Sequence, residues 1–195
     1  MTSSVRPFEK HVPRIGARAW IDPDARVIGN VELGDDVSLW PGVVLRGDVH
    51  AIRVGHRTNI QDHSVGHVTH DGPRTPGGSA LVVGDDVTVG HAAVLHACTI
   101  GNRVLVGMGA LVMDDVIVED DVMIAAGSLV APGKRLESGW LYRGRPAEAV
   151  RRLTDEEVEG LKYSAAHYVR LKDRYRAMES GVGGPGAPTR KPVSG

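Results

Sequence analysis

The sequence predicts a parallel β-helix, a solenoid of short strands, followed by one α-helix. The first observation is a period of six. Steps of six residues from Ile15 reach branched aliphatic residues through Leu45, and steps from Ile100 give a second series through Leu136. The second is a shortage of large side chains, since the 195 residues include three tryptophans, four tyrosines and one phenylalanine against 25 glycines. A period of six fits neither a helix nor a simple alternating strand. It fits flat strands joined by glycine- or aspartate-bearing turns around a narrow aliphatic interior.

The solenoid is expected to span residues 1–153. If three hexads make one coil, each interior aliphatic residue stacks on the residue 18 positions away. Residues 69–80 (THDGPRTPGGSA) interrupt the repeat with clustered glycine and proline, and are expected to form a loop ejected from the coil. The alternative is a valine- and glycine-rich sandwich that shows this period by accident.

Residues 154–179 change character and predict an amphipathic helix against the solenoid or a neighbour. The run Thr154-Asp155-Glu156-Glu157 reads as a capping box. One helical face collects apolar and aromatic residues, namely Val158, Leu161, Ala165, Tyr168 and Tyr175. Residues 180–195 (SGVGGPGAPTRKPVSG) are expected to form a flexible tail.

Composition excludes several classes of protein. The formal net charge of −1 argues against a protein whose main task is to bind nucleic acid or an anionic membrane. No run approaches 18 apolar residues, and the first residues carry no apolar segment typical of a secretory signal. Cys98 is the one cysteine, so an internal disulfide is impossible. We expect a cytoplasmic protein.

Seven of the nine histidines lie between residues 50 and 96. The hexads that carry His67 and His96 start 29 residues apart, which is one 18-residue coil plus the 11 residues that the ejected loop accounts for. The two imidazoles therefore occupy equivalent places in adjacent coils, where strands about 4.8 Å apart would let them share one metal ion. His91 belongs to the next face and could reach the pair of a neighbouring subunit. The alternative is that all are solvent-facing turn histidines, as expected for His50, His56 and His63.

The chain resembles the γ-class carbonic anhydrase-like hexapeptide-repeat proteins from about Arg14 to Tyr175. The motifs that carry the resemblance are Trp40-Pro41, Leu45-Arg46-Gly47-Asp48, Thr58-Asn59-Ile60-Gln61-Asp62, His67-Val68-Thr69-His70, Val89-Gly90-His91, Leu95-His96, Thr99-Ile100-Gly101-Asn102 and Val106-Gly107-Met108-Gly109. The resemblance implies a left-handed β-helix assembled as a homotrimer. It also implies a metal ion between subunits, held by His67 and His96 of one chain and His91 of the next.

The resemblance further implies reversible hydration of CO2 to bicarbonate by a metal-bound hydroxide. Three neutral imidazoles suit a catalytic Zn²⁺, and equally Fe²⁺, Co²⁺ or Ni²⁺. Gln61 matches the residue that orients the metal-bound oxygen. Arg46 matches an arginine at the subunit boundary, and Asp48 and Asp62 match the carboxylates that pair with it.

One departure concerns proton transfer. Active members of the family carry glutamates near the metal that shuttle protons, whereas Val49 follows Asp48 and the loop after His67 contains no glutamate. His70 or Asp71 could take this role, since histidine titrates near neutral pH.

Two other functions stay open. A hexapeptide-repeat acyltransferase or thioesterase acting on acyl-CoA would share the solenoid. Such enzymes, however, often use one histidine as base, whereas this chain has three histidines spaced to bind one metal ion. A catalytically silent, metal-binding assembly protein is favoured by the missing shuttle glutamates.

Overall fold

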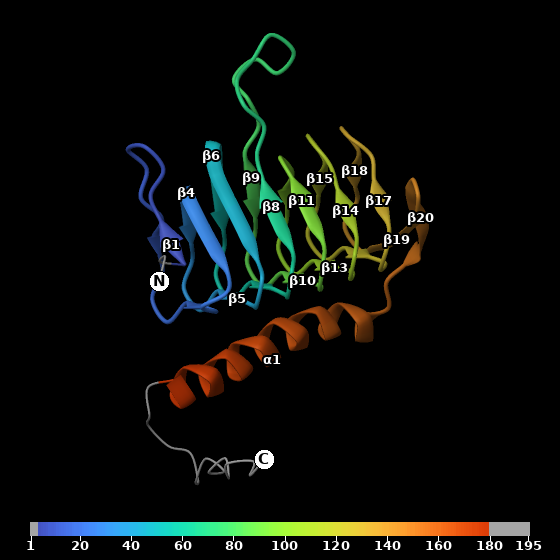
Figure 1. The fold of residues 1–195 in the computed structure, drawn as a ribbon. Coiled ribbons are helices and arrows are strands. Elements are labelled where there is room, and N and C mark those ends of the chain that lie inside the picture. Colours follow the sequence, from blue (N-terminus) through green and yellow to red (C-terminus); the bar gives the residue numbers. More distant parts are fainter. Residues whose placement is uncertain (1–3, 180–195) are drawn as a thin grey trace, which may run out of the picture.

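The computed structural model describes residues 4–179, which form a left-handed parallel β-helix and one C-terminal helix (Figure 1). This confirms the predicted fold class. The strands are β1 (Val5–Arg6), β2 (Arg14–Ile15), β3 (Trp20–Ile21), β4 (Arg26–Leu33), β5 (Ser38–Leu39), β6 (Val44–Val54), β7 (Asn59–Ile60), β8 (Val65–His67), β9 (Leu81–Val83), β10 (Thr88–Val89), β11 (Val94–His96), β12 (Thr99–Ile100), β13 (Leu105–Val106), β14 (Leu111–Val112), β15 (Ile117–Val118), β16 (Met123–Ile124), β17 (Leu129–Val130), β18 (Arg135–Leu136), β19 (Trp140–Gly144) and β20 (Ala147–Arg152). The helix is α1 (Asp155–Glu179). The tail predicted over 180–195 lies outside the described residues.

The strands stack into two sheets that wrap three faces. One sheet runs β3-β5-β7-β10-β13-β16-β19 and ends in the antiparallel β20. The other covers two faces because the long strand β6 continues around a corner, pairing with β8 through its first residues and with β9 through its last. The pairings between successive coils are parallel, as in that of Leu105 with Met123, and the register shifts once, between Gly29 and Val31 where β4 pairs with β6. The repeat therefore fixes which side chains become neighbours.

Residues at the period of six form the core. Val106, Val112, Val118 and Ile124 are at most 1% exposed, and Ile124 stacks on Val106 in the next coil. Ile15, at the start of the first series, is 41% exposed because β2 is an edge strand that pairs with β4 alone. The interior is thus closed along the coils and open at the first one.

Gly66 occupies one of these interior positions, and its lack of a side chain is a packing requirement. A Cβ atom there would lie 2.6 Å from Cδ2 of Leu45 and 2.9 Å from Cδ2 of Leu81. The two leucines therefore already fill the space. This glycine lets β8 run close to the core immediately before His67.

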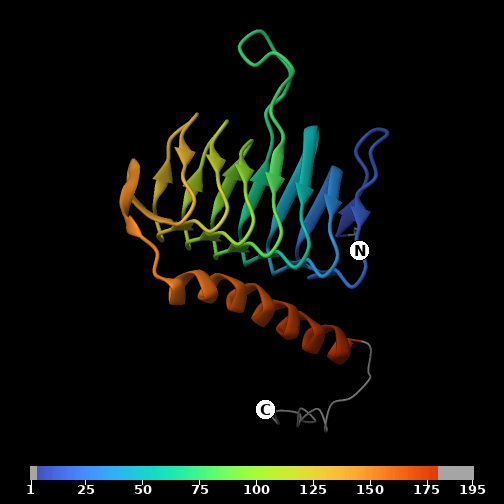
Figure 2. The same cartoon turned by 180° about the vertical axis from the view of Figure 1, so that it is seen from behind.

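Residues 69–80 leave the coil between β8 and β9. The two stems are joined by a pair of backbone hydrogen bonds between Thr69 and Ser79, each 3.0 Å. The loop projects beyond the rim of the solenoid, on the side away from α1 (Figures 1 and 2). The next coil then resumes in register at Leu81, so the insertion does not disturb the stacking.

Helix α1 lies along the face formed by β5, β7 and β10. Its buried residues are Leu161, Ala165 and Lys172. Tyr175 is 43% exposed, yet its ring packs within 5.2 Å of the rings of both Trp20 and Trp40. No helix among residues 4–179 is long and apolar enough to cross a membrane.

The capping box is present at the start of α1. The Thr154 amide donates to Glu157 Oε2 over 3.0 Å, and the Glu157 amide donates to Thr154 Oγ1 over 3.2 Å. Arg151 also binds Glu157, and together these contacts lower the pKa of Glu157 to about 2. An acidic first turn also suits the positive end of the helix dipole.

Thr154→Ala is expected to lower the free energy of unfolding by about 1 kcal/mol, because the Glu157 amide loses its acceptor. Urea titration followed by circular dichroism measures the loss. Thr154→Ser keeps the hydroxyl and serves as the control. Equal losses in both variants would show that the hydroxyl does not cap the helix.

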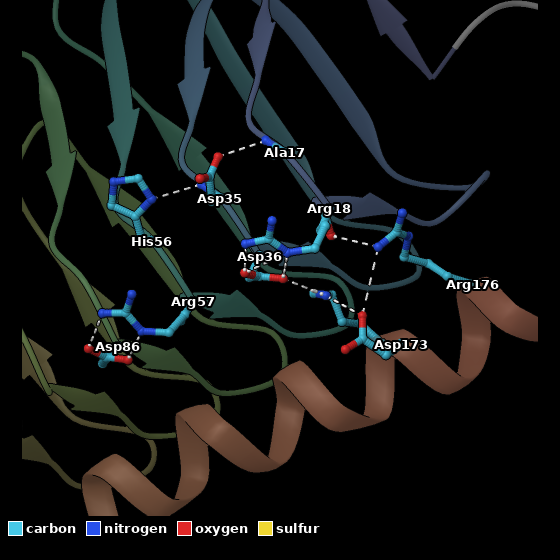
Figure 3. A network of polar contacts seen from close by, with 10 residues as sticks. Ala17, Arg18, Asp35, Asp36, His56, Arg57, Asp86, Asp173 and Arg176 are labelled. Atoms are coloured by element: carbon cyan, nitrogen blue, oxygen red, sulfur yellow. Dashed lines mark hydrogen bonds and ion pairs between the residues drawn. The ribbon is translucent and has the colours of Figure 1, made fainter.

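A ladder of polar contacts connects the coils along one corner (Figure 3). The Ala17 amide donates to Asp35 Oδ1, the Asp35 amide to His56 Nδ1, and the His56 amide to Asp85 Oδ1, over 2.7–2.9 Å. His56 is exposed, but it acts as a rung of this ladder and does not merely face solvent as the sequence suggested. At the next position, Arg and Asp alternate from coil to coil as ion pairs, namely Arg18–Asp36, Arg57–Asp86 and Arg103–Asp121.

Candidate metal centre

His67 and His96 lie side by side on adjacent coils. They are direct partners in the pairing of β8 with β11, and their side chains point out of the same face. The Nδ1 atom of His67 is 3.2 Å from the Nε2 atom of His96. The in-register stacking of the coils thus brings together two residues that are 29 positions apart in sequence.

A carboxylate binds the outer nitrogen of each imidazole. Asp48 Oδ1 lies 3.1 Å from Nε2 of His67, and Asp114 Oδ1 lies 2.7 Å from Nδ1 of His96. Because a carboxylate accepts, each of these nitrogens carries the hydrogen. When both imidazoles are neutral, the lone pairs of His67 Nδ1 and His96 Nε2 face one another; burial lowers the pKa of His67 and so favours its neutral form.

This donor set fits a divalent transition metal. Two imidazole nitrogens bound to one tetrahedral ion at about 2.0–2.1 Å are about 3.3–3.4 Å apart. The 3.2 Å between His67 Nδ1 and His96 Nε2 is close to that value. Carboxylates on the outer nitrogens are the usual support for metal-binding histidines.

His91 lies at the neighbouring corner, after β10. Its Nδ1 is 2.8 Å from Asp62 Oδ2, and its side chain is 48% exposed. Nε2 is therefore the nitrogen that a cation could reach. Among residues 4–179 of one chain, no three His, Cys, Asp or Glu side chains form a group that could hold a metal ion. The predicted third ligand is thus on a different corner of the same chain from the His67/His96 pair.

Gln61 belongs to a buried chain of polar groups that reaches α1. Its Nε2 donates to Asn59 Oδ1 over 3.2 Å, and Asn59 Nδ2 donates to Thr88 Oγ1 over 2.9 Å. Thr88 Oγ1 lies 3.0 Å from the hydroxyl of Ser164 on α1. Only 5% of Gln61 is exposed, so the chain of contacts holds its amide in one orientation.

Comparison with known proteins gives consistent matches. A family model described as bacterial transferase hexapeptide (six repeats) matches residues 13–47 and 97–132. The chain is 58% identical over 175 residues to Protein YrdA of Escherichia coli, which covers 90% of this chain and 95% of that protein. It is 35% identical over 175 residues to a carbonic anhydrase of Geobacillus kaustophilus, which covers 90% of this chain and 92% of that enzyme. The chain belongs to the γ-class carbonic anhydrase-like family of hexapeptide-repeat proteins.

A solved structure of a similar protein has the same fold. A hexapeptide transferase family protein from Anaplasma phagocytophilum superposes with a TM-score of 0.83 at 44% identity. The match covers 90% of this chain and 99% of that chain. The chain therefore shares its solenoid fold with that hexapeptide-repeat protein.

Of the two carboxylates predicted to pair with Arg46, one does so and the other has a different partner. Arg46 pairs with Asp48, as predicted, and the same carboxylate reaches His67. Burial alone would raise the pKa of Asp48, but hydrogen bonds from Arg46 and His67 outweigh it and hold that pKa below its ordinary value. Asp62 contacts His91 of its own chain and is not seen with Arg46.

His70 directly follows Thr69, the first stem of the ejected loop. It is exposed on the ejected loop, and its backbone carbonyl accepts from Thr75 Oγ1 over 2.8 Å. The family pattern therefore places His70 near the site in sequence, while the structure places it on the projecting loop.

Sequence reasoning missed two groups at the site. Asp114 was missed, although it lies 18 residues, one coil, beyond His96. Tyr168 was assigned to the packing face of α1, but its pKa is raised by burial and then by the charge of Asp62, while contact with Gln61 opposes the shift. The spacing of one coil would have found Asp114. Nothing local in the sequence links Tyr168 to Gln61.

Proposed function

We propose that this chain is a metal-dependent enzyme of CO2 hydration, active as a homotrimer with its metal sites between subunits. The observation that carries the proposal is the His67/His96 pair, with two nitrogens 3.2 Å apart and a carboxylate on each outer nitrogen. His91 of the next subunit would complete three imidazole ligands. The carbonic anhydrase of Geobacillus kaustophilus, 35% identical over most of both chains, supports this reaction.

The reaction combines CO2 and water into bicarbonate and one proton. A divalent cation on three neutral imidazoles would lower the pKa of a water molecule to about 7 and so supply the nucleophile at neutral pH. Asp48 keeps His67 in the tautomer that such a cation needs. The Asp62 contact does the same for His91.

Other residues bind, orient and carry protons in this proposal. Gln61 presents a fixed amide that orients the reacting oxygen, and Arg46 holds Asp48 at the subunit boundary. The proton produced must leave before the next turnover, and His70 on the projecting loop is the group that would take it.

The proposed function is tested by oxygen-isotope exchange between CO2 and water. Protein loaded with Zn²⁺, Co²⁺ or Fe²⁺ is expected to accelerate exchange, while protein stripped by a chelator is expected to lose the acceleration. Gln61→Ala should reduce the rate of the loaded protein without changing its metal content. Loaded protein that binds metal at one ion per chain and accelerates nothing would identify a silent metal-binding assembly protein instead.

Acyl transfer is the second candidate. It is favoured by the 44% identity to a protein described as a hexapeptide transferase family member. A panel of acyl-CoA thioesters, assayed for thiol release with and without acceptor amines, separates this function from CO2 hydration. Thioester turnover without isotope exchange would replace the first proposal with an acyltransferase or thioesterase.

Arg46→Ala is expected to weaken the trimer. Asp48 would lose its cationic partner, and the exposed apolar side chains nearby, Val49 and Val65, would pack less well across the boundary. Sedimentation at low micromolar concentration is expected to show a shift from trimer towards monomer. Arg14→Ala removes an exposed arginine of another ion pair and is the control. An Arg46→Ala protein with the mass of the unsubstituted one would contradict this role.

A further inference from the structure

Asp114 binds two different parts of the molecule through its two carboxylate oxygens. It follows β14, one coil beyond His96. Its Oδ1 accepts from Nδ1 of His96 over 2.7 Å, and its Oδ2 accepts from the hydroxyl of Thr69. His96 is a predicted metal ligand, whereas Thr69 begins the ejected loop. One side chain therefore connects the candidate metal centre to the base of that loop.

The next residue, Asp115, makes a matching contact without touching a histidine. Asp115 Oδ1 accepts from the hydroxyl of Ser79 over 2.7 Å. Thr69 and Ser79 are the two stems of the loop and are bridged by backbone hydrogen bonds of 3.0 Å. Asp114 thus binds the stem at Thr69, and Asp115 binds the stem at Ser79. Only the first of them also reaches a ligand.

We propose that Asp114 is a positioning residue that fixes the tautomer of His96. An acceptor on Nδ1 keeps the hydrogen there and leaves Nε2 with its lone pair towards Nδ1 of His67. Without this acceptor, a hydrogen could reside on Nε2, between the two imidazoles, where a cation would have to bind. This inference rests on the proposed function, because it gives His96 the role of a ligand.

A purely structural role is the competing explanation. Asp114 would then only hold one stem of the loop in place, as Asp115 holds the other. The two explanations differ in what loss of each aspartate does to His96. Loss of a residue that only holds the stem changes the loop. Loss of a positioning residue changes the tautomer of the His96 imidazole and the affinity of the site for metal.

The test compares Asp114→Ala, Asp114→Asn and the control Asp115→Ala. The tautomer of His96 is read from imidazole nitrogen chemical shifts in the metal-free protein. Affinity for Co²⁺ and Zn²⁺ is measured by competition with a chelator, and opening of residues 69–80 by amide hydrogen exchange. Asn keeps an oxygen that can accept from Nδ1, so Asp114→Asn also covers the case in which Asp114→Ala does not fold.

Asp114→Ala is expected to lose the Nδ1–H tautomer and to bind metal about 10–100-fold more weakly. Asp114→Asn is expected to keep the tautomer and to lose less affinity. Asp115→Ala should accelerate exchange in the loop and leave both the tautomer and the affinity unchanged. Retention of the tautomer and affinity in Asp114→Ala, or an equal loss of affinity in Asp115→Ala, would overturn the proposal.

The failure of the proposed function would look different. An unsubstituted protein that binds no metal would overturn the proposed function, whatever the aspartate variants do. The tautomer measurement would then still decide whether Asp114 sets the state of His96. Metal binding with an unchanged His96 in Asp114→Ala would overturn this inference alone.

Discussion

His91→Ala is expected to abolish metal binding at every site while the β-helix stays folded. The side chain is 48% exposed, and its described contact is with Asp62 at the surface of a corner. Its loss therefore removes no core packing. Each proposed site would keep His67 and His96 only, and two imidazoles bind a divalent ion far more weakly than three. Elemental analysis after gel filtration is expected to fall from about one ion per chain to near zero.

The matched control is His167→Ala. His167 is exposed on α1, and its described ring contacts are with Tyr163 and Tyr168, so its removal changes the histidine count equally and leaves the three predicted ligands in place. Its metal content should equal that of the unsubstituted protein. One ion per chain in His91→Ala would contradict a site that is shared between subunits.

Mixing two inactive variants tests the shared site more directly. His91→Ala chains keep His67 and His96, while His67→Ala chains keep His91. In trimers reassembled from both, some boundaries join the intact pair of one chain to His91 of the other, so metal binding should return. No recovery in proven mixed trimers would show that all three ligands must come from one chain.

The coil and the His67/His96 pair follow from the sequence for one physical reason. Buried aliphatic residues must stack at one spacing, and a slip in register would move each side chain to the other face. Once the register is set, the neighbours of any exposed residue are known as well. The insertion of residues 69–80 does not spoil this prediction because its stems close before Leu81.

The surroundings of the pair could be predicted only in part. The position of Asp114 could be predicted, because it lies 18 residues, or one coil, beyond His96. Whether Asp62 binds Arg46 or His91 could not, because that depends on the orientation of its side chain at a corner. The burial of a lysine was the least expected feature. Lys172 lies on the apolar face of α1 and is fully buried. Periodicity predicts that this position is buried, but it does not reveal that Asp36 lies opposite.

Asp36→Asn is expected to destabilise the protein more than Lys172→Met, although both break the same ion pair. The Lys172 ammonium is fully buried and lies 3.0 Å from Asp36 Oδ1. Asp36→Asn leaves that ammonium with the half-exposed Asp173 alone, and we expect a loss of about 2–3 kcal/mol in the free energy of unfolding. Lys172→Met removes the buried charge, and Asp36 keeps its contacts with Arg18, so a loss below about 1 kcal/mol is expected.

Acid should erase the difference between unsubstituted protein and Asp36→Asn. Hydrogen bonds from Arg18, and then from Lys172, hold the pKa of Asp36 below its ordinary value. A carboxylate whose pKa is lower in the folded state stabilises the fold above its unfolded pKa of about 3.9, and this contribution disappears as the pH falls through the folded value. Urea titrations at several pH values should therefore show unfolding curves that differ near neutral pH and converge in acid. Curves that keep the same separation at every pH would mean that the asparagine side chain destabilises the protein through its shape. The charge of Asp36 would then not be what holds α1 against the solenoid.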